Sequence, residues 1–130
     1  MIALLIDQNT LPIDGGIFVD FFGLPVPVSK AVAGLYVKTR PELAVVYAIA
    51  DKAGDYTVSA RRLPEEYRSS ESVREITQAI VGIMEAAIRE HPGQWMWAYR
   101  RWKFIPKNRA SEGFPAYARP IEPFELKRGA

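Results

Sequence analysis

Residues 72–90 read SVREITQAIVGIMEAAIRE and carry the most regular pattern in this chain of 130 residues. Apolar side chains recur there every three or four positions, the spacing of one face of an α-helix. The stripe consists of Val73, Ile76, Ile80, Ile83, Met84, Ala87 and Ile88. Ser72 and Glu75 have the spacing of a capping pair, and Pro92-Gly93 is a helix stop. The pattern predicts an amphipathic helix over 72–90 that buries one face.

The stretch that follows this helix is unusual for a core segment. Residues 91–103 read HPGQWMWAYRRWK and bring together three Trp, one Tyr and three basic residues. Trp side chains bury large areas, whereas Arg and Lys need anions, carbonyl oxygens or water. Spacing alone leaves two interpretations open. The segment is either anchored by its rings, with Arg side chains over Trp faces, or it binds an anion.

The order of these residues resembles the C-terminal signature of the lipid A biosynthesis acyltransferases. These are lauroyl and myristoyl transferases of the lysophospholipid acyltransferase superfamily. The similarity lies in Gln94-Trp95-Met96-Trp97 followed by Arg100-Arg101-Trp102-Lys103. Gly93 stands where the family often has an acidic residue, and Tyr99 where it often has His. The resemblance extends from residue 2 to about residue 107 and covers the C-terminal half of a family member.

Apolar runs elsewhere in the chain indicate the strands of a sheet. Ile2–Ile6 and Leu43–Ala50 are continuously apolar, which is typical of strands buried on both faces. Residues 56–63 alternate more and are expected to return beside the second run as a hairpin. The predicted class is therefore α/β: a partial mixed sheet flanked by helices, resembling the C-terminal half of the glycerolipid acyltransferase fold. Because the chain opens directly into a central strand, we expect it to be a fragment.

The remaining elements are punctuated by Pro, Gly and Ser. Asp14-Gly15-Gly16 is expected to be a loop, and Pro25 and Pro27 to interrupt regular structure. Ser29 is a good cap for a second helix over about 30–39, which Pro41 stops. We expect residues 1–109 to form the C-terminal part of an acyltransferase domain. Residues 110–130 are predicted to be an extended or partly disordered tail, because Pro115, Pro120 and Pro123 oppose regular elements.

Candidate substrate-binding residues follow from the resemblance. Asp7-Gln8-Asn9 comes after the first apolar run, where ligand sites of open α/β sheets collect, and a similar triplet recurs near the family's substrate cleft. From its position alone, Asp7 could equally cap a turn. Phe21-Phe22-Gly23 also resembles the family. One of these Phe rings is expected to line an apolar groove for an acyl chain, unless both pack beneath the next helix.

The basic and aromatic residues of the signature complete this set. Arg100, Arg101 and Lys103 suit a phosphate of the lipid or of a carrier's phosphopantetheine arm. The alternative is that the two Arg residues form structural pairs with carboxylates such as Asp7. Trp95, Trp97 and Trp102 are candidates for the membrane interface, where amphipathic rings are favoured.

Charge is unevenly distributed along the chain. Residues 96–130 hold eight basic and three acidic residues, a net charge of +5, whereas residues 1–95 hold nine basic and twelve acidic residues, a net charge of −3. Such asymmetry favours phosphates, an anionic lipid surface or an acidic protein, and by itself would suit nucleic acid equally. The absence of Cys excludes disulfides and thiolate metal sites, and the single His argues against a zinc site. No cofactor or metal is expected.

The family's catalytic pair is a His followed five positions later by an acid, and this pattern is absent. His91 is followed at that spacing by Met96, so no catalytic residue is expected; His91 fits the negative end of a helix dipole. The resemblance thus implies a fragment of a lipid A-type acyltransferase. Its partners would be acyl carrier protein or another acyl thioester donor, a lipid acceptor hydroxyl and a membrane surface, peripherally at the cytoplasmic face of the bacterial inner membrane.

Two alternatives remain open on the sequence. One is a basic-aromatic module that binds nucleic acid by stacking bases on Trp95 or Trp97, although the resemblance itself predicts no nucleic acid. The other is a noncatalytic remnant that pairs with a complete acyltransferase. Buried strands and the Asp7-Gln8-Asn9 triplet have no role in the first alternative.

Overall fold

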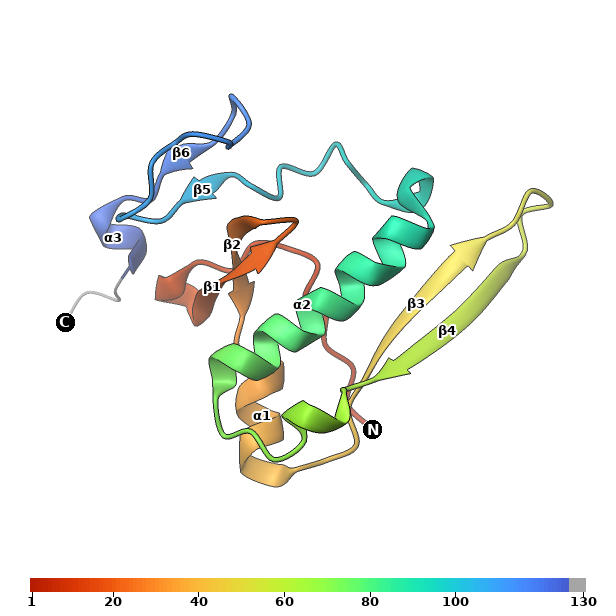
Figure 1. The fold of residues 1–130 in the computed structure, drawn as a ribbon. Helices are drawn as coiled ribbons and strands as arrows, with labels where there is room; N and C mark the ends of the chain where they lie inside the picture. The colour runs from red at the N-terminus through yellow and green to blue at the C-terminus, as the bar shows by residue number, and fades with distance from the viewer. Residues whose placement is uncertain (127–130) are drawn as a thin grey trace.

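The computed structural model of the chain describes residues 1–126, and Figure 1 shows its arrangement around one long helix. The helices are α1 (Ala31–Thr39), α2 (Val73–Glu90) and α3 (Pro123–Leu126). The strands are β1 (Gly16–Phe21), β2 (Leu24–Ser29), β3 (Ala44–Ala50), β4 (Tyr56–Arg62), β5 (Phe104–Ile105) and β6 (Arg119–Pro120). They form three two-stranded sheets, antiparallel for β1–β2 and β3–β4 and parallel for β5–β6. The α/β class is confirmed, but the strands of the described residues make three small sheets where one partial sheet was expected.

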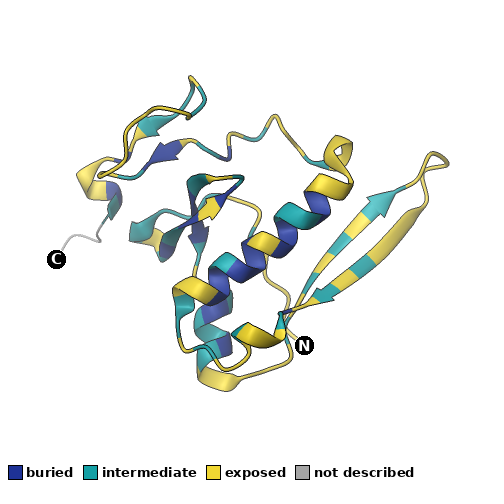
Figure 2. Cartoon of the chain, in the orientation of Figure 1, coloured by how far each residue is buried: buried dark blue, intermediate teal, exposed yellow. Residues whose placement is uncertain are grey.

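Helix α2 begins and ends as its sequence predicts. The Oγ of Ser72 accepts a hydrogen bond from the backbone N–H of Glu75 at 3.2 Å. The Glu75 carboxylate accepts from the hydroxyl of Ser70, which in turn accepts from the Ser72 N–H. His91 is the C-terminal capping residue. The predicted stripe is buried from Ile76 to Ile88, as the dark band along α2 in Figure 2 shows.

Two apolar clusters lie on either side of α2 and form the core. The first joins α2 to the β1–β2 hairpin through Val19, Phe21, Val26, Val28, Val81 and Ile88. The second joins α2 to α1 and to the residue that follows β4 through Ala33, Tyr36, Leu63, Ile76, Ala79 and Ile80. Burial on both sides explains why α2 carries a stripe wide enough to face two sets of neighbours. Both core clusters therefore contain residues of α2.

The β1–β2 hairpin was not expected, because Pro25 and Pro27 lie within β2. Both face non-hydrogen-bonded positions, opposite Asp20 and Phe18, so their missing N–H groups cost the ladder nothing. Phe22 and Gly23 form the two-residue turn, with φ values of 52° and 79°. Positive φ at both positions is the geometry of a tight hairpin turn, and Phe is an uncommon residue for it.

The β3–β4 hairpin is confirmed, but β3 is not buried on both faces. Its residues alternate between exposed and half-buried, and Val46 is 62% exposed. Only one face of this two-stranded sheet packs on the body; the hairpin runs beside α2 and its turn projects outward in Figure 1. The prediction that β3 is buried on both faces is therefore wrong. Within the described residues, no helix or strand covers the outer face of the β3–β4 sheet.

Residues 2–6 do not form the predicted buried strand. Ile2 and Leu5 are 72% and 88% exposed, and only Ile6 packs against the core. A strand needs a neighbour to pair with its N–H and C=O groups, and within residues 1–126 no strand pairs with this segment. Apolar composition alone was therefore insufficient to make it a strand.

Part of the predicted tail is regular. The N–H of Ile121 donates to the carbonyl of Ile105, and Arg119 forms a two-pronged ion pair with Glu125 at 2.5 and 2.8 Å. Pro123 is compatible with α3 because it occupies the first helical position, where no N–H is needed. Residues 127–130 of the expected tail lie outside the described residues.

Candidate functional site

Three of the predicted substrate-binding residues meet at an open pocket of about 550 Å³. They are Asn9, Arg100 and Lys103. Asn9 lies near the start of the chain, and the two basic residues lie more than 90 positions later. The complete lining is Asn9, Leu11, Asp14, Ala98, Tyr99, Arg100, Lys103 and Phe104. The pocket lies where the segment before β1 meets the loop that joins α2 to β5. We call it the Arg100 pocket.

The segment before β1 is held in place by a close backbone approach. The N–H of Gly16 donates to the Leu11 carbonyl, and a Cβ at position 16 would lie 1.7 Å from the Thr10 carbonyl oxygen. Only glycine fits such an approach. The sequence indicated a loop at this position, but the steric requirement at Gly16 depends on a contact that sequence does not display. Gly16 thereby fixes the course of the chain from Asn9 to Leu11.

Asn9 connects this segment to the signature by several bonds. Its N–H donates to the Tyr99 hydroxyl at 2.7 Å, and its Nδ2 donates to the Arg100 carbonyl at 3.1 Å. Its Oδ1 accepts from the Arg101 guanidinium at 3.2 Å. Asn9 thus uses its side chain for internal bonds and orders the pocket wall. Because the Tyr99 oxygen accepts from Asn9, its own O–H remains able to donate to a ligand.

Arg100 and Lys103 supply the positive charge of the pocket. Both side chains are exposed, and the Arg100 guanidinium lies 5.7 Å from the centre of the Tyr117 ring. The Lys103 ammonium lies 5.2 Å from the centre of the Phe104 ring. Asp14 is the one carboxylate in the lining, which leaves a net charge of +1. Stacked cations with free N–H groups suit an anionic oxygen ligand.

Arg101 occupies a different environment from its neighbour. Its side chain is 1% exposed and bonds to the Ile6 carbonyl and to Asn9 Oδ1, while its Nε has no partner. The guanidinium also lies over the Phe21 ring at 5.7 Å. Burial lowers the pKa of Arg101 to about 10, although Tyr99 and Asp7 act in the opposite direction. It is therefore still charged at neutral pH, and the ion pair with Asp7, the structural alternative left open by the sequence, is absent from the salt bridges of residues 1–126.

The remaining predicted residues lie apart from this pocket. Asp7 and Gln8 are exposed on the segment before it. Phe21 is fully buried in the core, and Phe22 is half-buried at the hairpin turn beneath Arg89, whose guanidinium is 4.7 Å from its ring centre. Neither Phe lines the Arg100 pocket.

The three Trp side chains of the signature differ in how far they are buried. Trp95 and Trp102 are half-buried against Phe21, at ring-centre distances of 5.9 and 5.6 Å. The Trp102 indole N–H donates to the Phe21 carbonyl. Trp97 is 51% exposed and Met96 is 73% exposed, so these two residues form the exposed apolar part of the signature.

Several residues at the site were not identified from sequence. Leu11, Asp14, Tyr99 and Phe104 line the Arg100 pocket, and Tyr117 stacks on Arg100. In the sequence, Tyr99 stands out only as a departure from the family's usual His. Gln94 belongs to the family-like signature, and its side chain bonds to both the N–H and the C=O of Ala50 at the end of β3. No periodicity in the sequence connects these partners.

Residues 1–126 contain neither a metal-binding cluster nor a membrane-spanning helix. No group of three or more carboxylate or imidazole side chains in this range is placed to hold a metal ion. None of the described helices combines the length and apolar character required to cross a bilayer.

Comparison with known proteins identifies the family. Residues 1–104 match the family model described as bacterial lipid A biosynthesis acyltransferase, and the match represents part of that domain. A comparison with curated proteins gave no match. The family is associated with the bacterial inner membrane and uses an acyl donor and a lipid acceptor. The match covers most of the chain, including the Arg100 pocket as far as Phe104, and the chain therefore belongs to the bacterial lipid A biosynthesis acyltransferase family.

Proposed function

We propose that this chain is the substrate-handling part of a lipid A-type acyltransferase. The enzyme would transfer a fatty acyl chain from acyl carrier protein to a hydroxyl of a lipid acceptor. The general base, a His with an acid five positions later, would come from polypeptide outside this chain, since His91 is followed at that spacing by Met96. The chain would act peripherally at the cytoplasmic face of the inner membrane.

The observation that carries this proposal is the convergence of Arg100, Lys103 and Tyr99 at one open pocket within the family match. Their free N–H and O–H groups can hold a phosphate of the lipid acceptor or of the carrier's phosphopantetheine arm. Arg101 and Asn9 lie behind them and fix the geometry. Binding of a remote phosphate would orient the reacting groups without any bond making by this chain.

Trp97 and Met96 support the membrane part of the proposal. Both are exposed on the loop after α2, so they can enter a lipid surface while the indole N–H of Trp97 remains bonded to the Pro92 carbonyl at 2.7 Å. The basic residues of the same segment would then face anionic lipid headgroups. Trp95 is less available for this role because it packs on Phe21.

The first experiment measures catalysis by the purified chain. With radiolabelled acyl carrier protein thioester and a lipid A precursor that has a free hydroxyl, we expect no acylated lipid above the background without protein. Turnover by this chain alone would contradict the proposal that it binds substrates while the general base comes from other polypeptide.

The second experiment measures binding of the phosphorylated lipid precursor in detergent micelles by intrinsic fluorescence, to which all three Trp residues contribute. We expect the Arg100→Ala, Lys103→Ala double variant to bind at least about tenfold more weakly, because two charge-assisted contacts are lost. Asp14→Asn should bind more tightly, because it removes the one carboxylate of the pocket. Lys107→Ala is the matched control, since Lys107 is exposed and outside the lining. Equal binding by all variants, or tighter binding of single-stranded RNA than of the lipid, would refute the proposal.

A further inference from the structure

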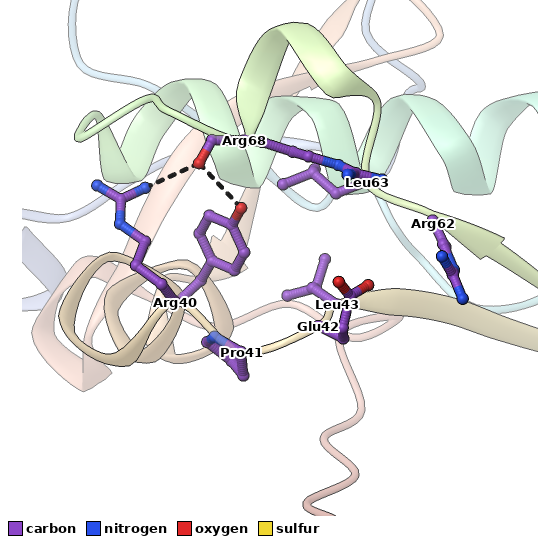
Figure 3. Close-up of a pocket in the computed structure, with 8 residues that line it drawn as sticks. Arg40, Pro41, Glu42, Leu43, Arg62, Leu63 and Arg68 are labelled. Atoms are coloured by element: carbon purple, nitrogen blue, oxygen red, sulfur yellow. Dashed lines mark hydrogen bonds between the residues drawn. The ribbon is translucent and has the colours of Figure 1, made fainter.

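A second pocket, of about 280 Å³, lies between α1, the β3–β4 hairpin and the turn after β4. Figure 3 shows the residues that surround it. Its lining is Tyr36, Arg40, Pro41, Glu42, Leu43, Arg62, Leu63 and Arg68. It shares no residue with the Arg100 pocket, and three of its eight lining residues are arginines. We call it the Arg62 pocket.

Arg40 is held rigidly at one side of this pocket. Its Nη1 donates to the carbonyls of Arg68 and Ser70 at 3.2 and 2.7 Å, and its guanidinium lies 5.5 Å from the centre of the Tyr36 ring. The Tyr36 hydroxyl donates to the same Arg68 carbonyl, as the dashed lines of Figure 3 show. The backbone of Arg40 is also fixed, because it ends α1 in the left-handed conformation (φ 47°) with its N–H bonded to the Tyr36 carbonyl.

The other two arginines have unused binding capacity. Arg62 is exposed and makes no side-chain hydrogen bond or ion pair within residues 1–126. Arg68 pairs with Glu65 at 2.9 Å, but both side chains of this pair are largely exposed, at 44% and 79%. Exposed pairs of this kind are weak and exchange readily with another anion. Glu42 is the one carboxylate in the lining, so the net charge of the pocket is +2.

The floor of the pocket is apolar. Leu63 is 3% exposed and Tyr36 is 6% exposed, and half-buried Leu43 lies beside them. A ligand that fits this arrangement carries an anionic head with oxygen acceptors and a short apolar part next to it. Guanidinium groups bind such oxygens through paired N–H donors.

We infer that the Arg62 pocket binds a phosphate monoester attached to an apolar group. A phosphate monoester carries between one and two negative charges at neutral pH, which matches the net charge of the lining better than a carboxylate does. Arg62 and Arg68 would contact the phosphate oxygens, Arg40 would add its remaining N–H groups, and the apolar floor would cover the first carbons of the ester. The inference does not depend on the function proposed for the Arg100 pocket.

The test uses hexyl phosphate as a soluble probe and follows backbone amide shifts by NMR. The protein carries Arg100→Ala and Lys103→Ala, so that the Arg100 pocket does not contribute. We expect saturable shifts confined to residues 36–43 and 62–68, and weaker binding of inorganic phosphate, which lacks the apolar group. The absence of saturable shifts at these residues would overturn the inference.

Variants of exposed residues then assign the contacts. In the same background, Arg62→Ala and Arg68→Ala should each weaken hexyl phosphate binding by about tenfold. Glu42→Gln should strengthen it several-fold, because a repulsive charge is removed. Lys38→Ala, which changes an exposed basic residue of α1 outside the lining, should leave it unchanged. If Arg62→Ala and Arg68→Ala bind like the parent protein, the pocket is not the site.

The source of the phosphate is separated by a vesicle experiment. Phosphatidylcholine vesicles with and without phosphatidic acid are sedimented with the parent protein and with its Arg62→Ala, Arg68→Ala form. Binding that requires phosphatidic acid and is lost in the double variant assigns the site to a lipid headgroup. If the protein binds hexyl phosphate but does not sediment with vesicles that contain phosphatidic acid, the site is assigned to a soluble phosphate monoester.

Discussion

At the scale of single residues, Arg100 and Arg101 show how adjacent identical side chains acquire different roles. Arg100 is exposed beside Tyr117 and lines a pocket, whereas Arg101 is buried against Phe21. A buried guanidinium is costly unless its N–H groups find acceptors, and Arg101 has two, from Ile6 and Asn9. Arg101 therefore ties the start of the chain to the core, and Arg100 remains free to meet a ligand.

This difference predicts that alanine substitutions at the two positions change stability by very different amounts. Arg101→Ala should lower the free energy of unfolding by about 3 kcal/mol, because it removes a fully packed side chain and leaves a cavity. Arg101→Met should recover part of this loss by refilling the volume. Arg100→Ala should change stability by less than about 0.5 kcal/mol, as expected for an exposed site. Urea unfolding followed by circular dichroism measures all three, and equal losses for Arg100→Ala and Arg101→Ala would contradict the assignment.

At the scale of elements, side chains of α2 and of the loop after it complete the open edges of the hairpins. Gln78 bonds to both the N–H and the C=O of Asp20 in β1, each at 2.8 Å. Gln94 does the same for Ala50 in β3. A side-chain amide offers one donor and one acceptor, so it can replace a neighbouring strand at one position. The hairpins are thus held to α2 by polar contacts as well as by apolar packing.

The start of α2 offers a direct test at this scale. Ser72→Ala should lower the free energy of unfolding by about 1 kcal/mol, because the N–H of Glu75 loses its acceptor. Ser69→Ala is the matched control, since Ser69 is exposed and makes no side-chain hydrogen bond within the described residues. Thermal or urea unfolding measures the difference, and an equal effect of the two substitutions would show that the cap does not contribute.

At the scale of the whole molecule, residues 104–126 attach the C-terminal part of the chain beside the Arg100 pocket. The buried Glu125 carboxylate accepts two hydrogen bonds from Arg119, whose guanidinium lies 4.9 Å from the centre of the Phe104 ring. Phe104 also lines the pocket. The attachment of the tail therefore fixes one wall of the site.

This attachment should depend on pH through Glu125. Its hydrogen bond to Arg119 lowers the pKa of the carboxyl in the folded protein. The unfolded chain therefore takes up the proton first as pH falls, and the stabilisation, complete above the unfolded pKa of about 4.3, is lost as pH drops through the folded pKa. At pH 7, Glu125→Gln should be less stable than the parent by about 1 kcal/mol, since Arg119 is partly exposed.

Urea unfolding between neutral and acid pH tests this expectation. The difference between the parent and Glu125→Gln should shrink as the solution is acidified, while Glu112→Gln, which changes an exposed carboxylate, should follow the parent. A difference that stays constant with pH would mean that the Arg119–Glu125 pair does not stabilise the fold.

By itself, the sequence determined the elements whose information is local. The apolar stripe and caps of α2, the helix after Ser29 and the hairpin around residue 53 all depend on neighbours within one or two turns of chain, and all are present. The family was also readable, because its signature from Gln94 to Lys103 is contiguous. Asn9, Arg100 and Lys103 were chosen from sequence and do meet at one pocket.

Only the tertiary structure decided which surfaces are covered. Apolar residues at 2–6 and in β3 look equally suited to a core, yet the first segment finds no strand to pair with in residues 1–126, and β3 packs on one face alone. In the same way, burial separates Arg101 from Arg100, and the Arg62 pocket draws on α1, the loop between α1 and β3, the end of β4 and the turn after it. Pairing and burial depend on contacts between distant parts of the chain, and local patterns of residue type do not specify them.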